Sequence, residues 1–362
     1  MKVLQVINSL DPGGAEKLLV QLIPLLQQEG LEVDLLLLGN GEHKFLKLLE
    51  DQPHGKIMKN GSMSAYNPLH ILRLRRLFKV YDLVHVHLFP ALYWCAFAHI
   101  IRANPPKMVF TEHNSTNRRR HHWLLRHIDR IAYARFDKVV TISDDVDTNL
   151  KNHLSGFSED RFFMINNGVD LNTIQNAKCK ERASLGLSDA DSVLLQVSSF
   201  TSQKDQACLI RALGKMNTKA QLLLVGEGPS MLNCRRLAEE LELENRVHFL
   251  GLRMDVPALL KTADVVVLSS NFEGLSLASI EGLASGAPFV ASRAPGLTEV
   301  VEGAGVLFET GNYRMLASEI DRLLRDTSHR DNVVASCLAR AKEYDIQKMK
   351  AQHLNLYASL CP

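Results

Sequence analysis

Short, almost continuously hydrophobic runs recur along this chain, and stretches with helical periodicity separate them. "VDLLLL" at 33–38 and "ADVVVL" at 263–268 are two of these runs. A strand with one solvated face alternates apolar and polar residues, whereas a continuous apolar run is typical of a parallel sheet covered by helices on both faces. Runs that alternate with helices indicate βαβ units. The chain is therefore predicted to be an α/β protein with doubly wound parallel sheets.

The predicted strands fall into two series, which divide the chain into two Rossmann-like domains. We expect an N-terminal domain over residues 1–170, a polar linker over 171–192 and a C-terminal domain over 193–344. A last helix at 345–362 either packs on the second domain or crosses back to the first. Ligands of doubly wound sheets bind at the carboxyl ends of the strands, so the cleft between two such domains is the predicted site.

Composition narrows the class of protein. A net charge of +2 does not suit a nucleic-acid-binding protein, which usually has a basic domain. The six cysteines form no C-x-x-C pair, which indicates reduced thiols rather than disulfides or a zinc site. The N-terminal "MKVLQVINSL" indicates a strand rather than a signal peptide, and no apolar stretch is long enough to span a bilayer. We expect a cytoplasmic protein, with binding to a membrane surface left open.

Two glycines follow the first predicted strand, in "NSLDPGGAEK". Gly13 and Gly14 precede a helix, so backbone amides and the positive end of the helix dipole can meet an anion there. An ordinary tight turn is the competing interpretation. The chain has no G-x-G-x-x-G pattern at this point, which gives a nicotinamide or flavin cofactor little support.

A second glycine-containing turn opens the segment "NFEGLSLASIEGLASGAP". Gly274, Leu275 and Ser276 are expected to present backbone N–H groups at the start of a helix, a seat for a phosphate or a sugar hydroxyl. Glu281, further into the helix, can accept hydrogen bonds from a ribose-like diol, and Glu273 can accept them from a second sugar. Two solvated carboxylates are the alternative, but the small residues around Glu281 favour a ligand.

Lys204 follows the first strand of the second series, in "LLQVSSFTSQKDQ". A lysine at the start of a helix interacts unfavourably with the helix dipole, which indicates a functional reason for its place. Its ammonium group could neutralise a diphosphate leaving group.

Together these segments resemble the motifs of the retaining glycosyltransferases of family 4, which have the GT-B fold. Glu273 and Glu281 correspond to the E-x7-E pair of that family. The other matching motifs are "GGAE" (13–16), "DLVHVH" (82–87), "TEHN" (111–114), "VVTIS" (139–143), "NNGVD" (166–170), residues 197–204, "GEGP" (226–229) and "HFLG" (248–251). The resemblance covers nearly the full chain and is specific for the family, though not for the sugar that is transferred.

The resemblance implies two Rossmann-like domains facing across a cleft, with a UDP-sugar as the donor. Glu281 would hold the ribose. Glu273, with the amides of Gly274 and Leu275, would hold the transferred sugar and its phosphate. Lys204 would contact the diphosphate.

The resemblance also assigns residues of the first domain. The loop of Gly13 and Gly14 would lie against the donor, and His87 would reach the sugar or phosphate near the reacting carbon. His113 is a further candidate of the same kind. For His87, a strand-end histidine satisfied by its neighbours is the alternative.

The chain departs from the "GR…K" pattern common in the family, because Ser198 and Ser199 stand at the first two positions. A charge-assisted hydrogen bond to phosphate is worth roughly 1.5–3 kcal/mol, whereas enzymes lower barriers by about 8–23 kcal/mol. Either Ser199 donates a smaller hydrogen bond or another cation compensates. Lys204, backbone amides and helix dipoles can stabilise the leaving group, so no metal or cofactor is expected to be required. The resemblance implies retention of the anomeric configuration. We prefer a same-face mechanism for it, in which the leaving phosphate helps to deprotonate the acceptor.

A basic segment with helical periodicity lies at 117–136, "NRRRHHWLLRHIDRIAYARF". Leu124, Ile128 and Ile131 share one face, whereas Arg126 and Arg130 share another with Arg119. Such a helix suits an anionic membrane surface. The alternatives are an ordinary helix packed on the sheet, or arginines that bind the diphosphate of an acceptor.

These observations predict a UDP-sugar-dependent hexosyl- or N-acetylhexosaminyltransferase that acts on a lipid-linked or oligosaccharide acceptor in glycan or polysaccharide biosynthesis. It would be cytoplasmic, either free or peripheral on the cytoplasmic face of the membrane, with no nucleic-acid partner. A transferase acting on a small soluble acceptor is one alternative. A non-catalytic nucleotide-sugar-binding partner of another transferase is the other, and Ser199 favours it.

Overall fold

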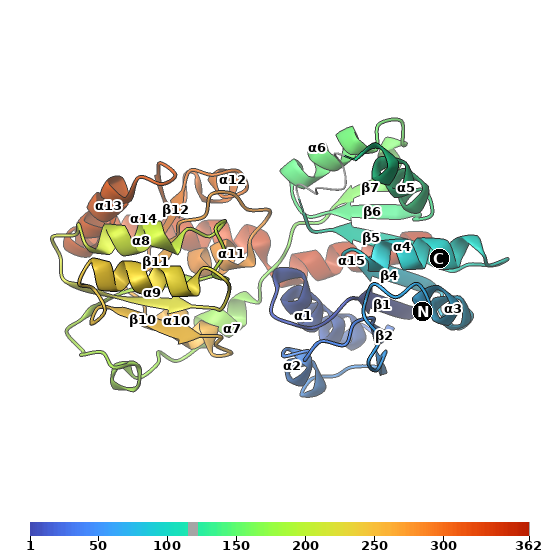
Figure 1. The fold of residues 1–362 in the computed structure, drawn as a ribbon, viewed down its shortest axis with the longest axis horizontal. Helices are drawn as coiled ribbons and strands as arrows, with labels where there is room; N and C mark the ends of the chain where they lie inside the picture. Colours follow the sequence, from blue (N-terminus) through green and yellow to red (C-terminus); the bar gives the residue numbers. More distant parts are fainter. Residues whose placement is uncertain (115–121, 362) are drawn as a thin grey trace. The chain divides into compact units, whose positions relative to one another are not determined.

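The computed structural model describes residues 1–114 and 122–361, which form two compact units (Figure 1). Met1–Gly168 and the C-terminal segment from Ile346 make up the first unit, and Val169–Asp345 makes up the second. Each unit contains one parallel sheet with helices. The predicted α/β class with two Rossmann-like sheets is therefore confirmed.

The first unit is built on a seven-stranded sheet of order β3-β2-β1-β4-β5-β6-β7. Its strands are β1 (Lys2–Ile7), β2 (Glu32–Leu37), β3 (Ile57–Lys59), β4 (Leu83–His87), β5 (Lys107–Glu112), β6 (Lys138–Thr141) and β7 (Phe162–Met164). Its α-helices are α1 (Gly14–Gln28), α2 (Leu46–Glu50), α3 (His70–Leu77), α4 (Ala91–Ile100), α5 (Trp123–Tyr133), α6 (Asp144–His153) and α15 (Ile346–Leu360).

The strands of this sheet are buried, as their continuous apolar runs predict. Leu4 on β1 packs with Val84 on β4 and Phe110 on β5 in one core cluster. Complete burial of such a side chain contributes about 1.5–3 kcal/mol. Gln5 on β1 is also fully buried, although it is polar, so it must find hydrogen-bond partners inside the unit.

Strand order reverses at β1, which pairs with β2 on one side and with β4 on the other. The register of Val3 with Leu83 and of Val6 with Val86 brings the carboxyl ends of β1 and β4 level. Doubly wound sheets bind ligands at such a reversal, outside the carboxyl ends of the strands. The loops that follow β1 and β4 are therefore the expected binding loops of this unit.

The second unit is built on a six-stranded sheet of order β10-β9-β8-β11-β12-β13. Its strands are β8 (Ser192–Val197), β9 (Ala220–Val225), β10 (Val247–Gly251), β11 (Val265–Leu268), β12 (Phe289–Ser292) and β13 (Val306–Phe308). Its α-helices are α7 (Leu171–Asn176), α8 (Gln206–Leu213), α9 (Met231–Glu240), α10 (Val256–Thr262), α11 (Leu277–Ala284), α12 (Thr298–Val301), α13 (Tyr313–Arg325) and α14 (Thr327–Ala341). The order reverses at β8, so the loops after β8 and β11 meet at the reversal of this sheet.

Residues 171–192, which we expected to be a polar linker without strands, contain α7 and a 3-10 helix at Arg182–Leu185, and they belong to the second unit. Asp170 caps α7 by accepting a hydrogen bond from the backbone N–H of Thr173 at 3.0 Å. The helix buries Leu171 and Ile174, so local capping and two apolar anchors give this polar segment its structure.

The C-terminal helix α15 packs in the first unit. Its Tyr357 is fully buried, and its Met349 Sδ accepts a hydrogen bond from the backbone N–H of Gly168 at 3.3 Å. Tyr357 reaches β1 and β4, whose residues precede it by hundreds of positions in the chain.

Within the basic segment 117–136, the structure forms α5 at Trp123–Tyr133, and residues 117–121, including Arg119, lie outside the described residues. The helix buries Asp129, Ala132 and Tyr133, whereas Leu124 and Ile131 are about half exposed. Ile128 alone of the predicted apolar face packs on the core. In the described part of the chain, every helix is too short or too polar to cross a bilayer.

Candidate active site

The loop that carries Lys204 is fixed by buried polar side chains at the end of β8. Gln196 Nε2 donates a hydrogen bond to the Lys204 carbonyl oxygen at 3.1 Å. The hydroxyl of Ser269, at the end of β11, lies 3.0 Å from Gln196 Oε1 and 2.9 Å from the Asp205 carbonyl oxygen. Lys204 precedes α8 by two residues rather than occupying its first turn. Its backbone is therefore held in place from two strands.

The Lys204 side chain forms an ion pair with Glu273, which follows β11. Lys204 Nζ lies 2.5 Å from Glu273 Oε1 and 2.6 Å from Glu273 Oε2. Ser270 Oγ donates a further hydrogen bond to Oε1 at 2.6 Å. Both charged side chains are largely buried, with 16% and 5% of their surfaces exposed. Two of the predicted site residues are thus brought together at the strand-order reversal.

The backbone at Glu273 is packed against the turn that follows β12. The N–H of Glu273 donates to the Pro295 carbonyl oxygen at 2.9 Å. Gly296 adopts a φ of +76°, and a Cβ at that position would lie 2.3 Å from the Glu273 carbonyl oxygen. A glycine is therefore required next to Glu273 on both conformational and steric grounds.

Helix α11 begins just after the Glu273 turn. Gly274 and Leu275 precede it, and Ser276 is its N-cap residue, whose side chain makes no capping hydrogen bond. The N-terminus of this helix therefore lacks the side-chain cap that would otherwise satisfy one of its first amides. Such an end is suited to an anion.

Glu281 lies on α11 and is 6% exposed, similar to Glu273 at 5%. The alternative of two solvated carboxylates is therefore wrong for both residues. Carboxylates are rarely buried unless they serve a paired or functional purpose. The sequence signal for this burial is the run of small residues on both sides of Glu281.

Ser199 differs from its neighbours because it is exposed. Its carbonyl oxygen, rather than its hydroxyl, accepts a hydrogen bond from Gln206 Nε2 at 2.9 Å. The hydroxyl of Ser198 accepts hydrogen bonds from the side chains of Gln196 and Gln206. Ser198 is thus part of the loop scaffold, whereas Ser199 points toward solvent.

In the first unit, Gly13 and Gly14 lie between β1 and α1, with Gly13 as the N-cap residue in an extended conformation. A Cβ on Gly13 would lie 2.2 Å from Glu16 Oε2, so the carboxyl group of Glu16 folds back over this glycine. Burial raises the pKa of Glu16 to about 7. A hydrogen bond from the Glu16 backbone N–H opposes this rise, and the charge of Asp11 adds to it. Glu16 is the last residue of the "GGAE" motif, but the sequence alone indicates no role for it.

His87 at the end of β4 contacts both Gln5 and His113. Gln5 Nε2 donates to Tyr357 Oη at 3.2 Å, which turns Gln5 Oε1 toward His87 Nε2 at 2.9 Å. This arrangement makes His87 the Nε2–H tautomer, so its Nδ1 accepts from His113 Nε2 at 3.2 Å. His87 is thus satisfied by its neighbours within the unit, and the two predicted histidines form one hydrogen-bonded pair.

Two further histidines, which sequence reasoning did not select, surround this pair. His85 Nδ1 lies 2.6 Å from Tyr357 Oη, and its Nε2 lies 2.7 Å from Thr111 Oγ1. The ring of His353, on α15, lies 5.5 Å from that of His85. His85 could have been selected from the sequence, because it stands two residues before His87 on the same predicted strand. His353 could not, because nothing local in the sequence connects α15 with β4.

The histidines of this cluster are neutral near pH 7. Burial, followed by the repulsion of neighbouring imidazoles, lowers the pKa of His85 and of His87 well below its usual value. Burial lowers the pKa of His113 to about 4 and that of His353 to about 3. A neutral imidazole can donate and accept hydrogen bonds but cannot neutralise a phosphate.

No cluster of three or more histidine, cysteine or carboxylate side chains suited to a metal occurs in residues 1–114 and 122–361. The "DAD" string at 189–191 forms part of a turn before β8, in which Asp191 Oδ2 accepts from the backbone N–H of Ser188 at 2.7 Å. The Asp191 carboxylate therefore stabilises a structural turn.

Two family models match the chain, Glycosyltransferase Family 4 over residues 12–173 and Glycosyl transferases group 1 over residues 178–336. They meet near the boundary of the two units. The motifs of both halves are thus matched by models of the same general class of protein.

Relatives and a solved structure agree with these models. The chain is 30% identical over 177 residues to N-acetyl-alpha-D-glucosaminyl L-malate synthase of Bacillus anthracis, covering 48% of this chain and 46% of that protein. It is 29% identical over 171 residues to N,N'-diacetylbacillosaminyl-diphospho-undecaprenol alpha-1,3-N-acetylgalactosaminyltransferase of Campylobacter jejuni, covering 47% and 45%. The matches span about half the length of these relatives. The structure of Anabaena Alr3699/HepE in complex with UDP-glucose is similar over 99% of this chain and 100% of that chain, with a TM-score of 0.85 and 25% identity.

Proposed function

Because the chain belongs to the family 4 glycosyltransferases of the GT-B fold, we propose that it transfers a hexose or an N-acetylhexosamine from a UDP-sugar. The acceptor is a lipid-linked sugar or an oligosaccharide in glycan or polysaccharide biosynthesis, and the anomeric configuration is retained. The observation that carries this proposal is the buried pair of Lys204 and Glu273 at the strand-order reversal, with Glu281 buried on the next helix. The reaction requires no metal or cofactor.

The donor is bound by residues of the second unit. Its diphosphate competes with Glu273 for the Lys204 ammonium group, which can turn because lysine has a flexible stem and rotatable donors. Glu273 then accepts hydrogen bonds from the hydroxyls of the sugar. The uncapped N-terminus of α11, with the amides of Gly274, Leu275 and Ser276, binds phosphate oxygens. Glu281 accepts from the ribose hydroxyls.

The transfer step exchanges one carbon–oxygen bond for another on the same face of the sugar. The bond between the anomeric carbon and the diphosphate breaks while the acceptor oxygen bonds to that carbon. The acceptor proton passes to an oxygen of the leaving phosphate, and the charge that remains on UDP is stabilised by Lys204. Because the leaving group is itself the base, no protein carboxylate has to act as a covalent nucleophile.

The first unit contributes neutral groups to this reaction. Both ring nitrogens of His87 are occupied, so its contact with the sugar requires exchange of the hydrogen bond to His113. Glu16 already places a carboxyl group over Gly13, which makes the loop of Gly13 and Gly14 better suited to a sugar hydroxyl than to a phosphate. We therefore place donor or acceptor hydroxyls, rather than the diphosphate, against this loop.

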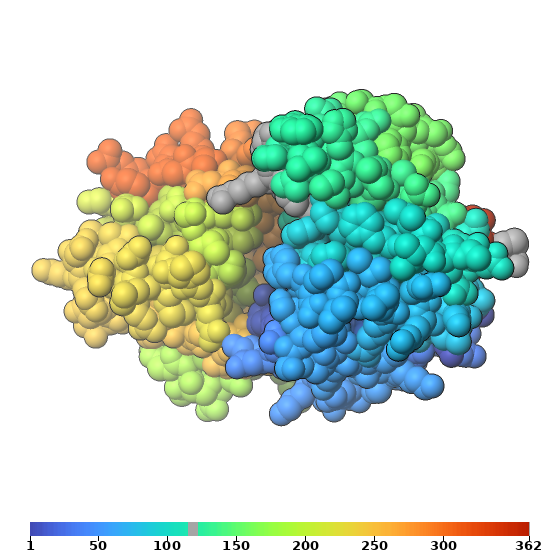
Figure 2. Space-filling model, turned by 45° about the vertical axis from the view of Figure 1, so that its right-hand side comes forward, coloured from blue at the N-terminus to red at the C-terminus, as the bar shows by residue number. Residues whose placement is uncertain are grey.

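A lipid-linked acceptor is supported by exposed apolar side chains among basic ones. On α5, Trp123 is 71% exposed and lies beside the half-exposed Leu124. On α3 and its flanks, Leu69 and Leu72 are exposed near several arginines, and Figure 2 shows this stretch in light blue on the face turned toward the reader. Such a mixture favours the headgroup region of an anionic bilayer. We place the protein in the cytoplasm, peripheral on the cytoplasmic face of the membrane.

Vesicle sedimentation tests this surface. Wild type should sediment with vesicles that contain anionic lipid, and Trp123→Ser/Leu124→Ser should not, while Leu232→Ser on α9 serves as an exposed control in the second unit. If the wild type does not bind such vesicles, the two other interpretations of segment 117–136 remain, which are an ordinary helix packed on the sheet and arginines that bind the diphosphate of an acceptor. The name of the Bacillus anthracis relative includes L-malate, and a small soluble acceptor would likewise be consistent with absence of vesicle binding.

A non-catalytic nucleotide-sugar-binding partner of another transferase is the competing function. Ser199, in place of the usual arginine, favours it, whereas the presence of Lys204, Glu273, Glu281 and His87 opposes it. Release of UDP from a UDP-sugar in the presence of a crude lipid extract separates the two functions. Turnover that disappears in Lys204→Met supports the enzyme, and binding without turnover supports the partner.

Calorimetric titration tests the donor site directly. UDP, UDP-GlcNAc, UDP-GalNAc and UDP-Glc are titrated into wild type, Glu281→Ala, Glu273→Gln and the exposed control Glu244→Ala. Glu281→Ala should lose affinity for UDP itself, whereas Glu273→Gln should lose mainly the extra affinity for one UDP-sugar. Unchanged UDP binding in Glu281→Ala would refute its assignment to the ribose. Wild-type protein that binds none of the four ligands would refute the UDP-sugar donor.

A further inference from the structure

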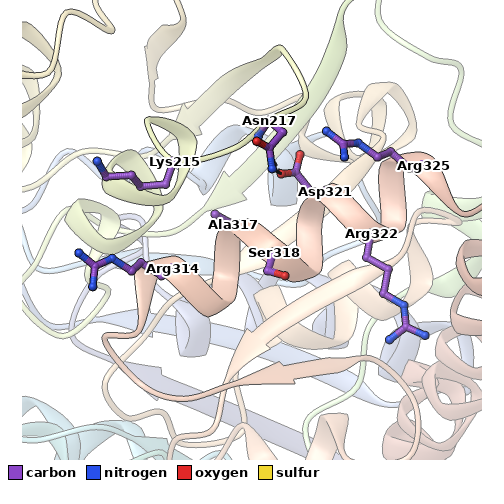
Figure 3. A pocket seen from close by; sticks show the side chains of 8 residues that line it. All are labelled: Lys215, Asn217, Arg314, Ala317, Ser318, Asp321, Arg322 and Arg325. Atoms are coloured by element: carbon purple, nitrogen blue, oxygen red, sulfur yellow. Dashed lines mark hydrogen bonds between the residues drawn. The ribbon is translucent and has the colours of Figure 1, made fainter.

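A pocket of about 510 Å³ opens on the second unit between helix α13 and the loop that follows α8 (Figure 3). Lys215 and Asn217 line it from the loop, and Arg314, Ser318, Arg322 and Arg325 line it from the helix. The helical positions follow one another at intervals of four, four and three residues, so they share one face of α13. The pocket is thus lined on one side by an arginine-rich helix face.

This pocket lies away from the proposed donor site. Lys215 and Asn217 precede β9, at the amino ends of the parallel strands. Lys204 and Glu273 follow the carboxyl ends of β8 and β11. In a parallel sheet these are opposite edges, so a ligand in the pocket and a donor at the strand-order reversal do not share residues.

The single carboxylate of the pocket is already satisfied by the backbone. Asp321 accepts hydrogen bonds at 2.8 Å from the backbone N–H groups of Asn217 and Thr218. Burial raises its pKa, but these hydrogen bonds outweigh burial and hold the pKa below its usual value. Figure 3 shows Asn217 and Asp321 pointing toward one another, which ties the loop to α13. Asp321 therefore holds the loop against α13, and its charge also attracts Arg325, one of the four cations of the pocket.

The cations of the pocket have few partners, although the Arg314 guanidinium lies 5.6 Å from the centre of the Tyr313 ring. Among the described residues, no carboxylate pairs with Lys215, Arg314 or Arg322, and all three are exposed. Arg325 donates from Nε to Thr218 Oγ1 at 3.1 Å, a neutral partner. In Figure 3, Lys215 and Arg314 extend to the same side of the pocket. Four cationic side chains thus line a concave site whose one carboxylate is engaged elsewhere.

We propose that this pocket binds a ligand that carries phosphate or diphosphate groups, at a site separate from that of the nucleotide-sugar. Guanidinium groups match phosphate oxygens with paired hydrogen bonds, and Ser318 and Asn217 supply neutral donors. The pocket lining contains no aromatic side chain on which a base could stack. The phosphate groups therefore belong either to a free phosphorylated molecule or to a lipid headgroup, which share this chemistry.

Inorganic pyrophosphate and vesicles are the two probes. Pyrophosphate is titrated by calorimetry into wild type, into Arg314→Ala/Arg322→Ala, and into Lys178→Ala/Lys342→Ala, which removes the same charge from exposed lysines outside the pocket. Each charge-assisted hydrogen bond lost should weaken binding about tenfold, so the pocket variant should bind about 100-fold more weakly than the control. Binding should also weaken steeply with salt, because the Debye length falls to about 3 Å at 1 M.

Sedimentation with phosphatidic acid vesicles, against phosphatidylcholine vesicles alone, forms the second arm. Pyrophosphate binding that depends on the two arginines identifies a free phosphorylated ligand, and vesicle binding that depends on them identifies a lipid headgroup. Equal behaviour of wild type and the pocket variant toward both probes overturns the proposal. Lys215→Ala, on the opposite wall, repeats the test with a second variant. Pyrophosphate that binds at Lys204 should still bind to both pocket variants, so it can be distinguished from pyrophosphate bound in the pocket.

Discussion

Replacing Lys204 by methionine should destabilise the second unit through the charge that it leaves behind. Glu273 is 5% exposed and would retain one hydrogen bond, that from Ser270 at 2.6 Å. Breaking a buried ion pair by removing one partner costs about 3–5 kcal/mol, because the remaining charge is unpaired. We take about 3 kcal/mol, since the Lys204 side chain is 16% exposed and water can reach the site. For a unit of this size the melting temperature should fall by about 6–12 °C.

Two reporters separate this effect from general damage. Both tryptophans, Trp94 and Trp123, lie in the first unit, so intrinsic fluorescence follows the first unit while differential scanning calorimetry follows both. Lys204→Met should lower the calorimetric transition of the second unit and leave the transition reported by fluorescence in place. Lys178→Met, an exposed control, should change stability by less than about 0.5 kcal/mol.

The double variant Lys204→Met/Glu273→Gln completes the test. It removes the unpaired charge and keeps the shape of the side chain, so most of the lost stability should return. A double variant that is as unstable as the sum of its single variants would refute the reasoning, because the two side chains would then act independently. A single variant as stable as wild type would show that the pair contributes no stability in solution.

Three further perturbations have expected outcomes. Gly296→Ala should lower the melting temperature of the second unit in calorimetry, since its φ of +76° and the Glu273 carbonyl oxygen exclude a Cβ. Tyr357→Phe should reduce the free energy of unfolding of the first unit, followed by fluorescence in urea, by about 1 kcal/mol for each hydrogen bond to Gln5 and His85. Finally, the folded pKa values of His113 and His353, about 4 and about 3, lie below the usual 6.5. Their contribution to stability is therefore full above about pH 6.5 and should be lost as the pH falls toward 4 and 3. Unchanged fluorescence-detected stability between pH 7 and pH 4.5 would contradict the burial of these imidazoles as neutral groups.

The parts of the molecule that sequence predicts well are those fixed by local pattern. Continuous apolar runs indicate buried parallel strands, and residues just after such strands must lie at one edge of a sheet. Lys204 and Glu273 follow β8 and β11, so their meeting follows from strand order. Their direct ion pair does not follow from strand order. The sequence leads us to expect that each side chain contacts the ligand, not the other side chain.

The parts that sequence misses depend on contacts between distant segments. Gln5 and Tyr357 are 352 residues apart and share a hydrogen bond, and no periodicity in either segment signals it. The exposure of Leu124 on α5 is a second case, because an amphipathic pattern shows that a helix has an apolar face but not which face is buried. In both cases tertiary packing, rather than local preference, decides the outcome.

The return of α15 to the first unit makes the second unit an insertion within the first. The chain enters the second unit at Val169 and leaves it at Asp345, and these two residues form a parallel bridge, with the Val169 N–H donating to the Tyr344 carbonyl oxygen at 2.9 Å. During synthesis, all residues of the second unit emerge from the ribosome before α15 does. The first unit therefore lacks Tyr357 until the whole of the second unit has been made, so the second unit can complete its core before the first unit does.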